Sequence, residues 1–191
     1  MNEQNESFLF LLGSSRRDGN TEQLVREAAA AALPAQTSKD WLRMSEHPLP
    51  PFVDIRHEPA PVYETQTGVE AMLLERTLAA SHLVFAMPLY WYSLPADTKR
   101  YLDYWSAWMR VPGADFKRRM AGKSLSVVTT VSDENRSVAT PLIESLRLTA
   151  DYLAMQFRGA VVAFGNQPGE ALNDASIVDR IGALLGAGVA A

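Results

Sequence analysis

GSSRRDGNT, residues 13–21, decides the fold class of this chain, because it joins an apolar run to a helical pattern. The run FLFLL at residues 8–12 precedes it, and a continuous apolar segment of this length is typical of a strand buried on both faces of a parallel sheet. Apolar residues then recur at helical spacing until Pro34, and we expect Asn20 to cap this helix together with Gln23. The stretch is therefore predicted to be a strand-to-helix turn.

The predicted turn has the composition of an anion site. A helix N-terminus offers unpaired N–H groups and a partial positive charge, which favour a phosphate group. Hydroxyls, an amide and the guanidinium of Arg16 or Arg17 add further donors. The turn lacks the Gly-Lys-Ser/Thr ending of a nucleoside triphosphate loop, and Gly13 and Gly19 stand too far apart for the dinucleotide fingerprint. We interpret it as a phosphate cradle; an ordinary turn with solvated arginines is the alternative.

Length and composition limit the number of domains and the kinds of partner that this chain can have. The 191 residues, 47% of them apolar, suffice for one compact core, so we expect a single domain over residues 7–191 after a disordered tail of residues 1–6. A net charge of −4 gives no general attraction to nucleic acid or to an anionic membrane. The chain contains no cysteine, which excludes thiolate catalysis and cysteine-ligated metals. The tail does not resemble a signal peptide and no apolar run has membrane-spanning length, so a cytoplasmic protein is expected.

The rest of the chain repeats the alternation of strand and helix. A proline-rich loop over residues 46–66 interrupts it once. Five strand and helix units predict an α/β fold, a doubly wound five-stranded parallel sheet with the order 2-1-3-4-5, in which ligands bind beyond the first and third strands. The further strands are expected at residues 40–44, 82–87, 123–131 and 160–164, and the further helices at about 69–78, after Pro95, at 140–156 and at 174–185.

The turn after the predicted third strand is suited to a flat ring. It reads PLYWYSLP, residues 88–95, and its prolines stiffen the backbone while Tyr90 and Trp91 offer aromatic faces. In the predicted strand order this turn and the phosphate cradle line one crevice, and the polar turn that begins at Ser132 closes its far side. A phosphate joined to a planar ring, in a site without an acid and base pair, indicates flavin mononucleotide (FMN).

Aromatic residues are concentrated in one part of the sequence. Seven of the ten Trp and Tyr residues lie between Tyr90 and Trp108, and those after Pro95 share one face of a predicted helix. We interpret this face as packing partly on the sheet and partly on a second subunit. Packing in the core of one chain is the alternative.

These motifs resemble those of the flavodoxin-like NAD(P)H-dependent FMN reductases and quinone reductases. The resemblance extends from about Ser7 onward and rests on GSSRxxGNT at residues 13–21, PLYWxxxPxxxKxxxD at 88–103 and LRLTADYL at 146–153. It implies a homodimer or homotetramer with the flavin near the subunit interface. It also implies that the FMN phosphate is held by Ser14, Arg16, Asn20 and Thr21, and the edge of the isoalloxazine ring by Pro88, Leu89, Tyr90 and Trp91.

The resemblance further implies that a hydride from NAD(P)H reaches bound FMN and that electrons continue to a small acceptor such as a flavin or a quinone. We assign no catalytic side chain and no metal ligand. The chain departs from many relatives in having VSDE at residues 131–134 instead of a Gly-Gly pair, and Thr98 before the motif lysine. Three other functions are compatible with the sequence: a flavodoxin-type electron carrier without NAD(P)H activity, a flavin-free module, and a metal site built from His47, His57 and His82.

Overall fold

The computed structural model describes residues 6–64 and 66–186 and contains the predicted sheet. Five strands pair in parallel in the order β2-β1-β3-β4-β5, so the doubly wound order 2-1-3-4-5 is confirmed. The strands are β1 (Ser7–Leu12), β2 (Ser38–Arg43), β3 (His82–Pro88), β4 (Ser124–Val131) and β5 (Gln156–Phe164).

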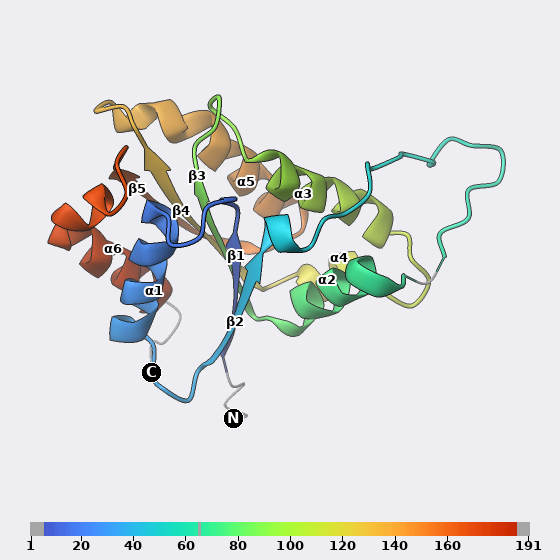
Figure 1. Cartoon of the computed structure of the whole chain (residues 1–191). Helices are drawn as coiled ribbons and strands as arrows, with labels where there is room; N and C mark the ends of the chain where they lie inside the picture. Colours follow the sequence, from blue (N-terminus) through green and yellow to red (C-terminus); the bar gives the residue numbers. More distant parts are fainter. Residues whose placement is uncertain (1–5, 65, 187–191) are drawn as a thin grey trace.

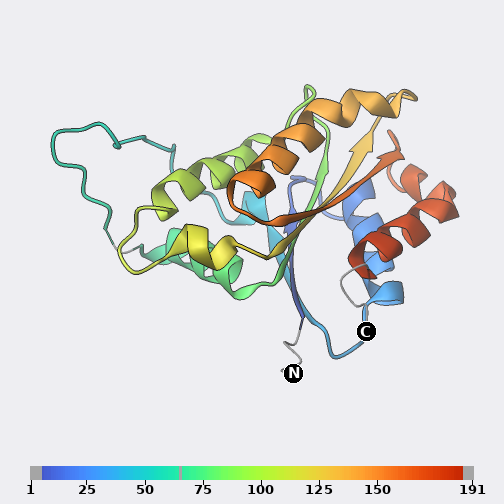
Figure 2. The same cartoon turned by 180° about the vertical axis from the view of Figure 1, so that it is seen from behind.

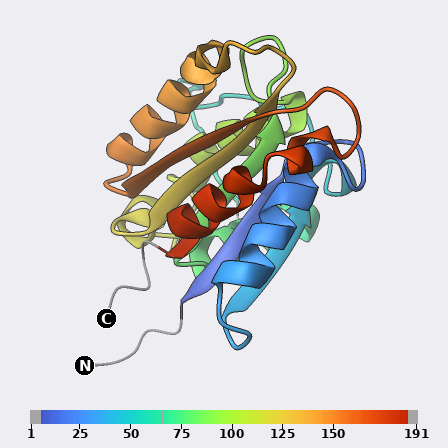
Figure 3. The ribbon, with the colours of Figure 1, turned by 90° about the vertical axis from the view of Figure 1, so that its left-hand side faces the viewer.

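Helices cover both faces of the sheet. Figure 1 places α1 and α6 on one side and the other four on the opposite side, and Figure 3 shows α1 and α6 lying in front of the sheet. Each side has its own apolar core. The helices are α1 (Asn20–Ala32), α2 (Gly68–Ala79), α3 (Ala96–Trp108), α4 (Phe116–Met120), α5 (Thr140–Tyr152) and α6 (Ala175–Gly186), with short 3-10 turns η1 (Met44–Glu46), η2 (Arg136–Ala139) and η3 (Glu170–Asn173).

The unbroken apolar run of β1 reflects this double covering. Phe8 and Phe10 point into the core beneath α1 and α6, whereas Leu9 and Leu11 point into the core beneath α2 to α5. Successive side chains of a strand point to opposite faces, so a strand covered on both sides needs an apolar residue at every position.

Two helix boundaries differ from the sequence prediction. The residue that caps α1 is Gly19, and Asn20 is the first residue of the helix. The expected capping interaction between Asn20 and Gln23 is absent among the described residues. Instead, the Asp18 N–H donates a hydrogen bond to the Glu22 carboxylate at 3.0 Å. The second difference is in α5, which was expected to extend to residue 156. It stops at Tyr152 because Ala154 adopts a left-handed φ of 53° and turns the chain into β5.

The aromatic face of α3 belongs to the core of this chain. Tyr101, Tyr104, Trp105 and Trp108 are all buried, and their rings contact one another, Phe85 and Phe116. The part of the interpretation that packs this face on the sheet is confirmed for these four residues, and contact with a second subunit stays a prediction. A helix on a parallel sheet buries its broad face against the strands, and large rings fill that layer.

The proline-rich segment forms the predicted long loop. Figures 1 and 2 show it projecting from the body of the molecule beside α2 and α3. Its start is tied to α3, since Arg100 Nη1 donates to the carbonyl oxygen of Leu49 at 3.1 Å and Tyr104 Oη donates to that of Pro50 at 3.2 Å. Residues 1–5 of the expected tail lie outside the described residues, so its disorder stays a prediction. None of the described helices has the length and hydropathy needed to cross a bilayer.

Candidate functional site

The turns after β1 and β3 meet at one crevice. A cavity of about 240 Å³ lies between them at the carboxyl edge of the sheet. The ends of β4 and β5 complete its wall. Eight of the nine predicted site residues line this cavity, namely Ser14, Arg16, Asn20, Thr21, Pro88, Leu89, Tyr90 and Ser132, and the ninth, Trp91, lines the cavity next to it.

Close packing holds the first turn against the sheet. The Gly13 N–H donates to the Ala86 carbonyl oxygen of β3 at 2.9 Å. A Cβ atom at Gly13 would lie 2.6 Å from Thr98 Oγ1 and 2.7 Å from Met87 Cβ, so only glycine fits between β3 and α3. Beyond it, Ser14 Oγ accepts from the Arg16 N–H at 3.1 Å. The start of the turn is therefore held against β3 by a backbone hydrogen bond, and the Ser14 side chain braces the residues that follow.

The start of α1 presents polar groups to the cavity. Asn20 Nδ2 donates to the Gln167 carbonyl oxygen at 2.9 Å, while its Oδ1 is buried and has no hydrogen-bond partner among the described residues. A buried acceptor without a partner is unfavourable unless a ligand or water supplies one. Thr21 Oγ1 lies 2.7 Å from Thr130 Oγ1, which links α1 to the end of β4.

The two arginines of the turn have different roles. Arg17 pairs with Glu46 at 2.5 Å and does not line the cavity. Arg16 is exposed and lines it. The sequence left open which arginine serves the cradle, and the geometry favours Arg16.

Behind the turn lies a buried ion pair that sequence reasoning did not identify. Arg43 Nη2 donates to Glu22 Oε2 at 2.6 Å, and Arg43 Nη1 donates to the Arg16 carbonyl oxygen at 2.7 Å. Burial raises the pKa of Glu22, but hydrogen bonds from Arg43, Arg26 and the Asp18 N–H outweigh this effect and hold that pKa below its ordinary value. Glu22 is therefore a carboxylate at neutral pH.

Sequence reasoning also missed four lining residues. Gly19 is part of the turn itself, while Thr130, Gly165 and Asn166 stand at the ends of β4 and β5. A Cβ atom at Gly165 would lie 2.9 Å from Asn20 Nδ2, so this glycine lets β5 approach the cradle closely. The available signal was the polar sequence GNQPG directly after a predicted strand, because all five strands end at the same edge.

The turn after β3 has an unusual backbone. Tyr90 and Ser93 exchange backbone hydrogen bonds of 3.2 and 3.0 Å, which closes a tight turn. Its two central residues, Trp91 and Tyr92, have left-handed φ angles of 49° and 61°, although such turns favour asparagine and glycine. Trp91 is 93% exposed. Two aromatic side chains are thus held outward beside the crevice.

A second cavity continues the first past this turn. It measures about 290 Å³, is lined by Trp91 and Tyr92 among others, and shares Leu89 and Ser132 with the cradle cavity. The two cavities are therefore neighbours, the first lined by polar groups at the start of α1 and the second by aromatic side chains. Asp133 lines the second cavity, in the segment where the sequence departs from the Gly-Gly pair of many relatives.

The histidines lie away from this crevice. His82 starts β3 at the opposite edge of the sheet, where its ring stacks on Phe8 with centroids 4.5 Å apart, and burial lowers its pKa. His47 and His57 lie in the proline-rich segment. Over residues 6–64 and 66–186, no three histidine, aspartate or glutamate side chains are grouped as a metal ion would require.

Comparison with known proteins gives the family of this chain. The family model described as NADPH-dependent FMN reductase matches residues 7–169. The chain belongs to this family. This chain is 29% identical over 174 residues to YwqN of Bacillus subtilis, whose name describes a putative NAD(P)H-dependent FMN-containing oxidoreductase. That match covers 91% of this chain and 93% of YwqN.

Solved structures share the fold of this FMN reductase. The Trp repressor binding protein from Bacillus subtilis is 25% identical with a TM-score of 0.72, and the match covers 94% of this chain and 97% of that one. An FMN-dependent NADH-azoreductase from Bacillus anthracis, solved with FMN, is 13% identical with a TM-score of 0.62, and the match covers 93% and 96% of the two chains. At that identity the second likeness concerns the fold alone.

The residues present fit the cofactor of the family. The unpartnered Asn20 Oδ1, the hydroxyls of Ser14 and Thr21, and Arg16 offer polar groups at one end of the crevice, and Leu89 and Tyr90 offer apolar surface farther along. This FMN reductase is an NAD(P)H-dependent oxidoreductase that uses FMN.

Proposed function

We propose that the crevice binds FMN with its phosphate at the α1 end and its isoalloxazine ring at the turn after β3. Ser14, Arg16, Asn20 and Thr21 would hold the phosphate. Pro88, Leu89, Tyr90 and Trp91 would hold the ring, with Ser132 on the far wall. The observation that carries this proposal is that the two cavities adjoin at Leu89 and Ser132, because FMN is an elongated molecule with a charged end and a flat end.

Each group in the crevice has a task that its chemistry allows. The Arg16 guanidinium and the hydroxyls form charge-assisted hydrogen bonds to a phosphate, each contributing roughly 1.5–3 kcal/mol. The backbone between Leu89 and Ser93 is fixed by the hydrogen bond from the Leu89 N–H to the Thr130 carbonyl oxygen at 3.0 Å, which presents a rigid edge to the ring. FMN, when bound, supplies hydride and electron transfer chemistry. The protein supplies position and electrostatics.

Removing the phosphate contacts tests this assignment. We expect Arg16→Ala combined with Asn20→Ala to give a folded but largely colourless protein, because the cofactor loses its charged anchor. The measurement is the flavin to protein ratio from the absorption spectrum, with circular dichroism to verify folding. Arg17→Ala is the matched control, since Arg17 pairs with Glu46 and does not line the cavity. Stoichiometric flavin in the double variant would contradict the cradle assignment.

A small acceptor completes the proposed reaction, and a flavin or a quinone is the class we expect. The rival function is that of an electron carrier that depends on a separate reductase. We expect the purified protein alone to oxidise NAD(P)H when a quinone is present. A yellow protein that leaves NAD(P)H unchanged under those conditions would favour the carrier. We place this reaction in the cytoplasm, where NAD(P)H is supplied.

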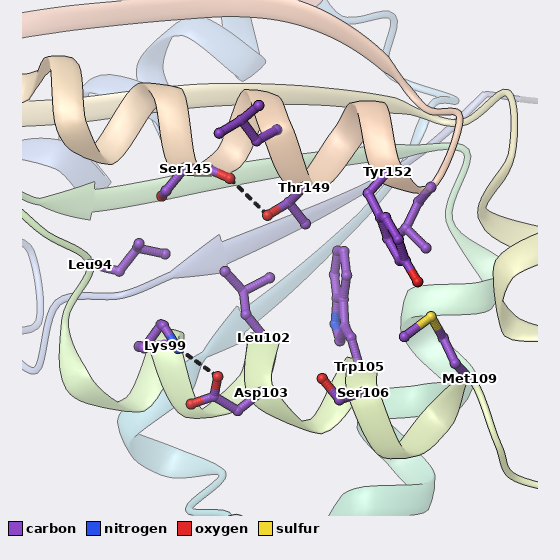
Figure 4. Close-up of a pocket in the computed structure, with 12 residues that line it drawn as sticks. Leu94, Lys99, Leu102, Asp103, Trp105, Ser106, Met109, Ser145, Thr149 and Tyr152 are labelled. Atoms are coloured by element: carbon purple, nitrogen blue, oxygen red, sulfur yellow. Dashed lines mark hydrogen bonds and ion pairs between the residues drawn. The ribbon is translucent and has the colours of Figure 1, made fainter. Parts of the chain in front are cut away.

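We also propose that the protein works as a homodimer or a larger homo-oligomer, through the groove between α3 and α5. Figure 4 shows side chains of both helices pointing into this groove, which measures about 360 Å³. Leu148 and Tyr152 on its rim are 57% and 60% exposed. The lining carries both signs of charge, in the pair Lys99–Asp103. In a dimer with two-fold symmetry the same surface meets itself, and a surface with both signs of charge can then be complementary to its own copy.

A further inference from the structure

The ion pair behind the phosphate cradle places a negative charge on the residue that follows Asn20 and Thr21, two of the proposed phosphate contacts. Glu22 lies in the first turn of α1, two residues after Asn20, and its side chain is only 4% exposed. A carboxylate and a phosphate dianion repel each other, and the repulsion is stronger where water is excluded. A cradle built beside this carboxylate therefore needs a compensating positive charge.

Two arginines compensate Glu22, but only one of them is buried. Arg26 Nη2 lies 2.9 Å from Glu22 Oε1, yet the Arg26 side chain is 46% exposed, so solvent screens that pair. Arg43 Nη2 lies 2.6 Å from Glu22 Oε2, and the Arg43 side chain is 9% exposed. Arg43, at the end of β2, is thus the buried counter-charge of Glu22, although its Nε also lies 3.4 Å from Oε1 of the half-exposed Glu46.

Arg43 also holds the backbone of the turn. Its Nη1 donates to the Arg16 carbonyl oxygen at 2.7 Å and, more weakly, to that of Ser14 at 3.4 Å. Because a peptide group is planar, fixing a carbonyl oxygen also fixes the N–H of the following residue on the opposite side. One guanidinium group therefore joins β2 to the turn and to the first turn of α1.

We propose that Arg43 is a positioning residue that gives this reductase its preference for FMN over riboflavin. It neutralises the carboxylate beside the phosphate position and fixes the turn that contacts the phosphate. The ligand class that it selects is a flavin with a terminal phosphate dianion. This inference rests on the proposed function, because it assumes that the cradle holds the FMN phosphate.

The test compares FMN and riboflavin affinity in full-length variants, measured by titrating flavin fluorescence. In Arg43→Met we expect FMN to bind about 30-fold more weakly or worse, because one member of a buried charge pair is lost. Riboflavin affinity should change by less than about 3-fold, since riboflavin carries no phosphate for Glu22 to repel. A general weakening of the structure would lower both affinities together.

Two further variants sharpen the result. Glu22→Gln combined with Arg43→Met should bind FMN more tightly than Arg43→Met alone, because the repelling charge is gone. Arg26→Met is the matched control: it removes the exposed partner of the same carboxylate and should leave the FMN to riboflavin ratio close to that of the wild type. If Arg43→Met fails to fold by circular dichroism, Arg43→Lys takes its place. Arg43→Lys retains the charge but loses the two-nitrogen geometry, and its preference for FMN should still fall.

Different outcomes would contradict the role of Arg43 and the proposed binding of the FMN phosphate. Equal losses of FMN and riboflavin affinity in Arg43→Met or Arg43→Lys, an unchanged preference for FMN, or no recovery in the double variant would overturn the role of Arg43. A wild-type protein that binds FMN and riboflavin equally well would instead overturn the phosphate cradle itself.

Discussion

Gly165 shows how a single missing side chain shapes the candidate site. A Cβ atom there would lie 2.9 Å from both Asn20 Nδ2 and Ala171 Cβ. We expect Gly165→Ala to lower the free energy of unfolding by about 1–3 kcal/mol, as overpacking does, and to weaken FMN binding because Asn20 is displaced. Chemical denaturation and a flavin titration measure the two effects. Gly186→Ala, where no described neighbour lies within 4 Å of the new atom, is the control. Unchanged FMN affinity in Gly165→Ala would argue against a role for Asn20.

The backbone conformation of Trp91 leads to a second prediction about a single residue. Its φ of 49° is unfavourable for a bulky residue, and its 93% exposed ring makes few contacts that could offset the strain. We expect Trp91→Gly to raise the free energy of unfolding by about 0.5–1 kcal/mol, after subtracting the larger entropy loss of glycine on folding. Trp91→Ala should show no such gain, because its Cβ atom keeps the strain. A destabilised Trp91→Gly would mean that the ring contributes packing energy.

Single residues of the site were predictable when their chemistry followed directly from position. Ser14, Arg16 and Asn20 stand between a buried strand and a helix, where an anion site is expected. Arg43 and Glu22 were not predictable, because their pairing joins positions 21 apart in sequence through the packing of β2 against β1. Only the register of the two strands brings the guanidinium to the turn.

At the scale of elements, the start of α1 depends on the ionisation of Glu22. Its pKa is below the ordinary value of 4.5, so the ionised group stabilises the folded state above that pH. This contribution is lost as the pH falls through the pKa of the folded state. We therefore expect the wild type to be more stable than Glu22→Gln at neutral pH, with the difference shrinking below about pH 4.5. Urea denaturation at several pH values measures this. A difference that does not depend on pH would rule out the charge of Glu22 as its cause.

The type and order of the strands followed from sequence better than the limits of the helices. The apolar runs at β1, β3 and β4 are continuous because both faces are covered, and that signal is strong. The helix ends were less predictable: the Asp18 N–H before α1 is paired with Glu22, and α5 stops two residues before the left-handed Ala154. The five-residue helix α4 was not predicted, since so short a segment carries little periodicity.

For the whole molecule, the strand order accounts for the location of the site. In the order β2-β1-β3-β4-β5 the chain moves away from β1 in both directions, so the turns after β1 and β3 must open on a shared crevice. Two loops about 70 residues apart were assigned to one ligand from this topology, and the shared cavity confirms their proximity. The packing of the aromatic helix could not be decided in this way, because a face of large rings suits a core and an interface equally well.

Large apolar side chains are concentrated on one part of the outer surface of the molecule. Five of the eight exposed large apolar residues among those described, namely Tyr90, Trp91, Tyr92, Leu148 and Tyr152, lie on the turn after β3 or on the rim of the groove between α3 and α5. Leu94 joins the two regions, since it follows the turn and lines the groove. A monomer rarely exposes large apolar residues so close together. We expect the wild type to sediment as a dimer or a larger species.

Leu148→Asp tests that surface directly. An unpaired carboxylate buried in an apolar contact costs several kcal/mol, so we expect this variant to sediment as a monomer while keeping its circular dichroism spectrum. Val62→Asp is the matched control, because Val62 is 68% exposed in the proline-rich segment and does not line the groove. If the flavin lies near the interface, the monomeric variant should also bind FMN more weakly. A wild type that sediments as a monomer at all concentrations, or a Leu148→Asp variant that remains a dimer, would exclude this groove as the subunit contact.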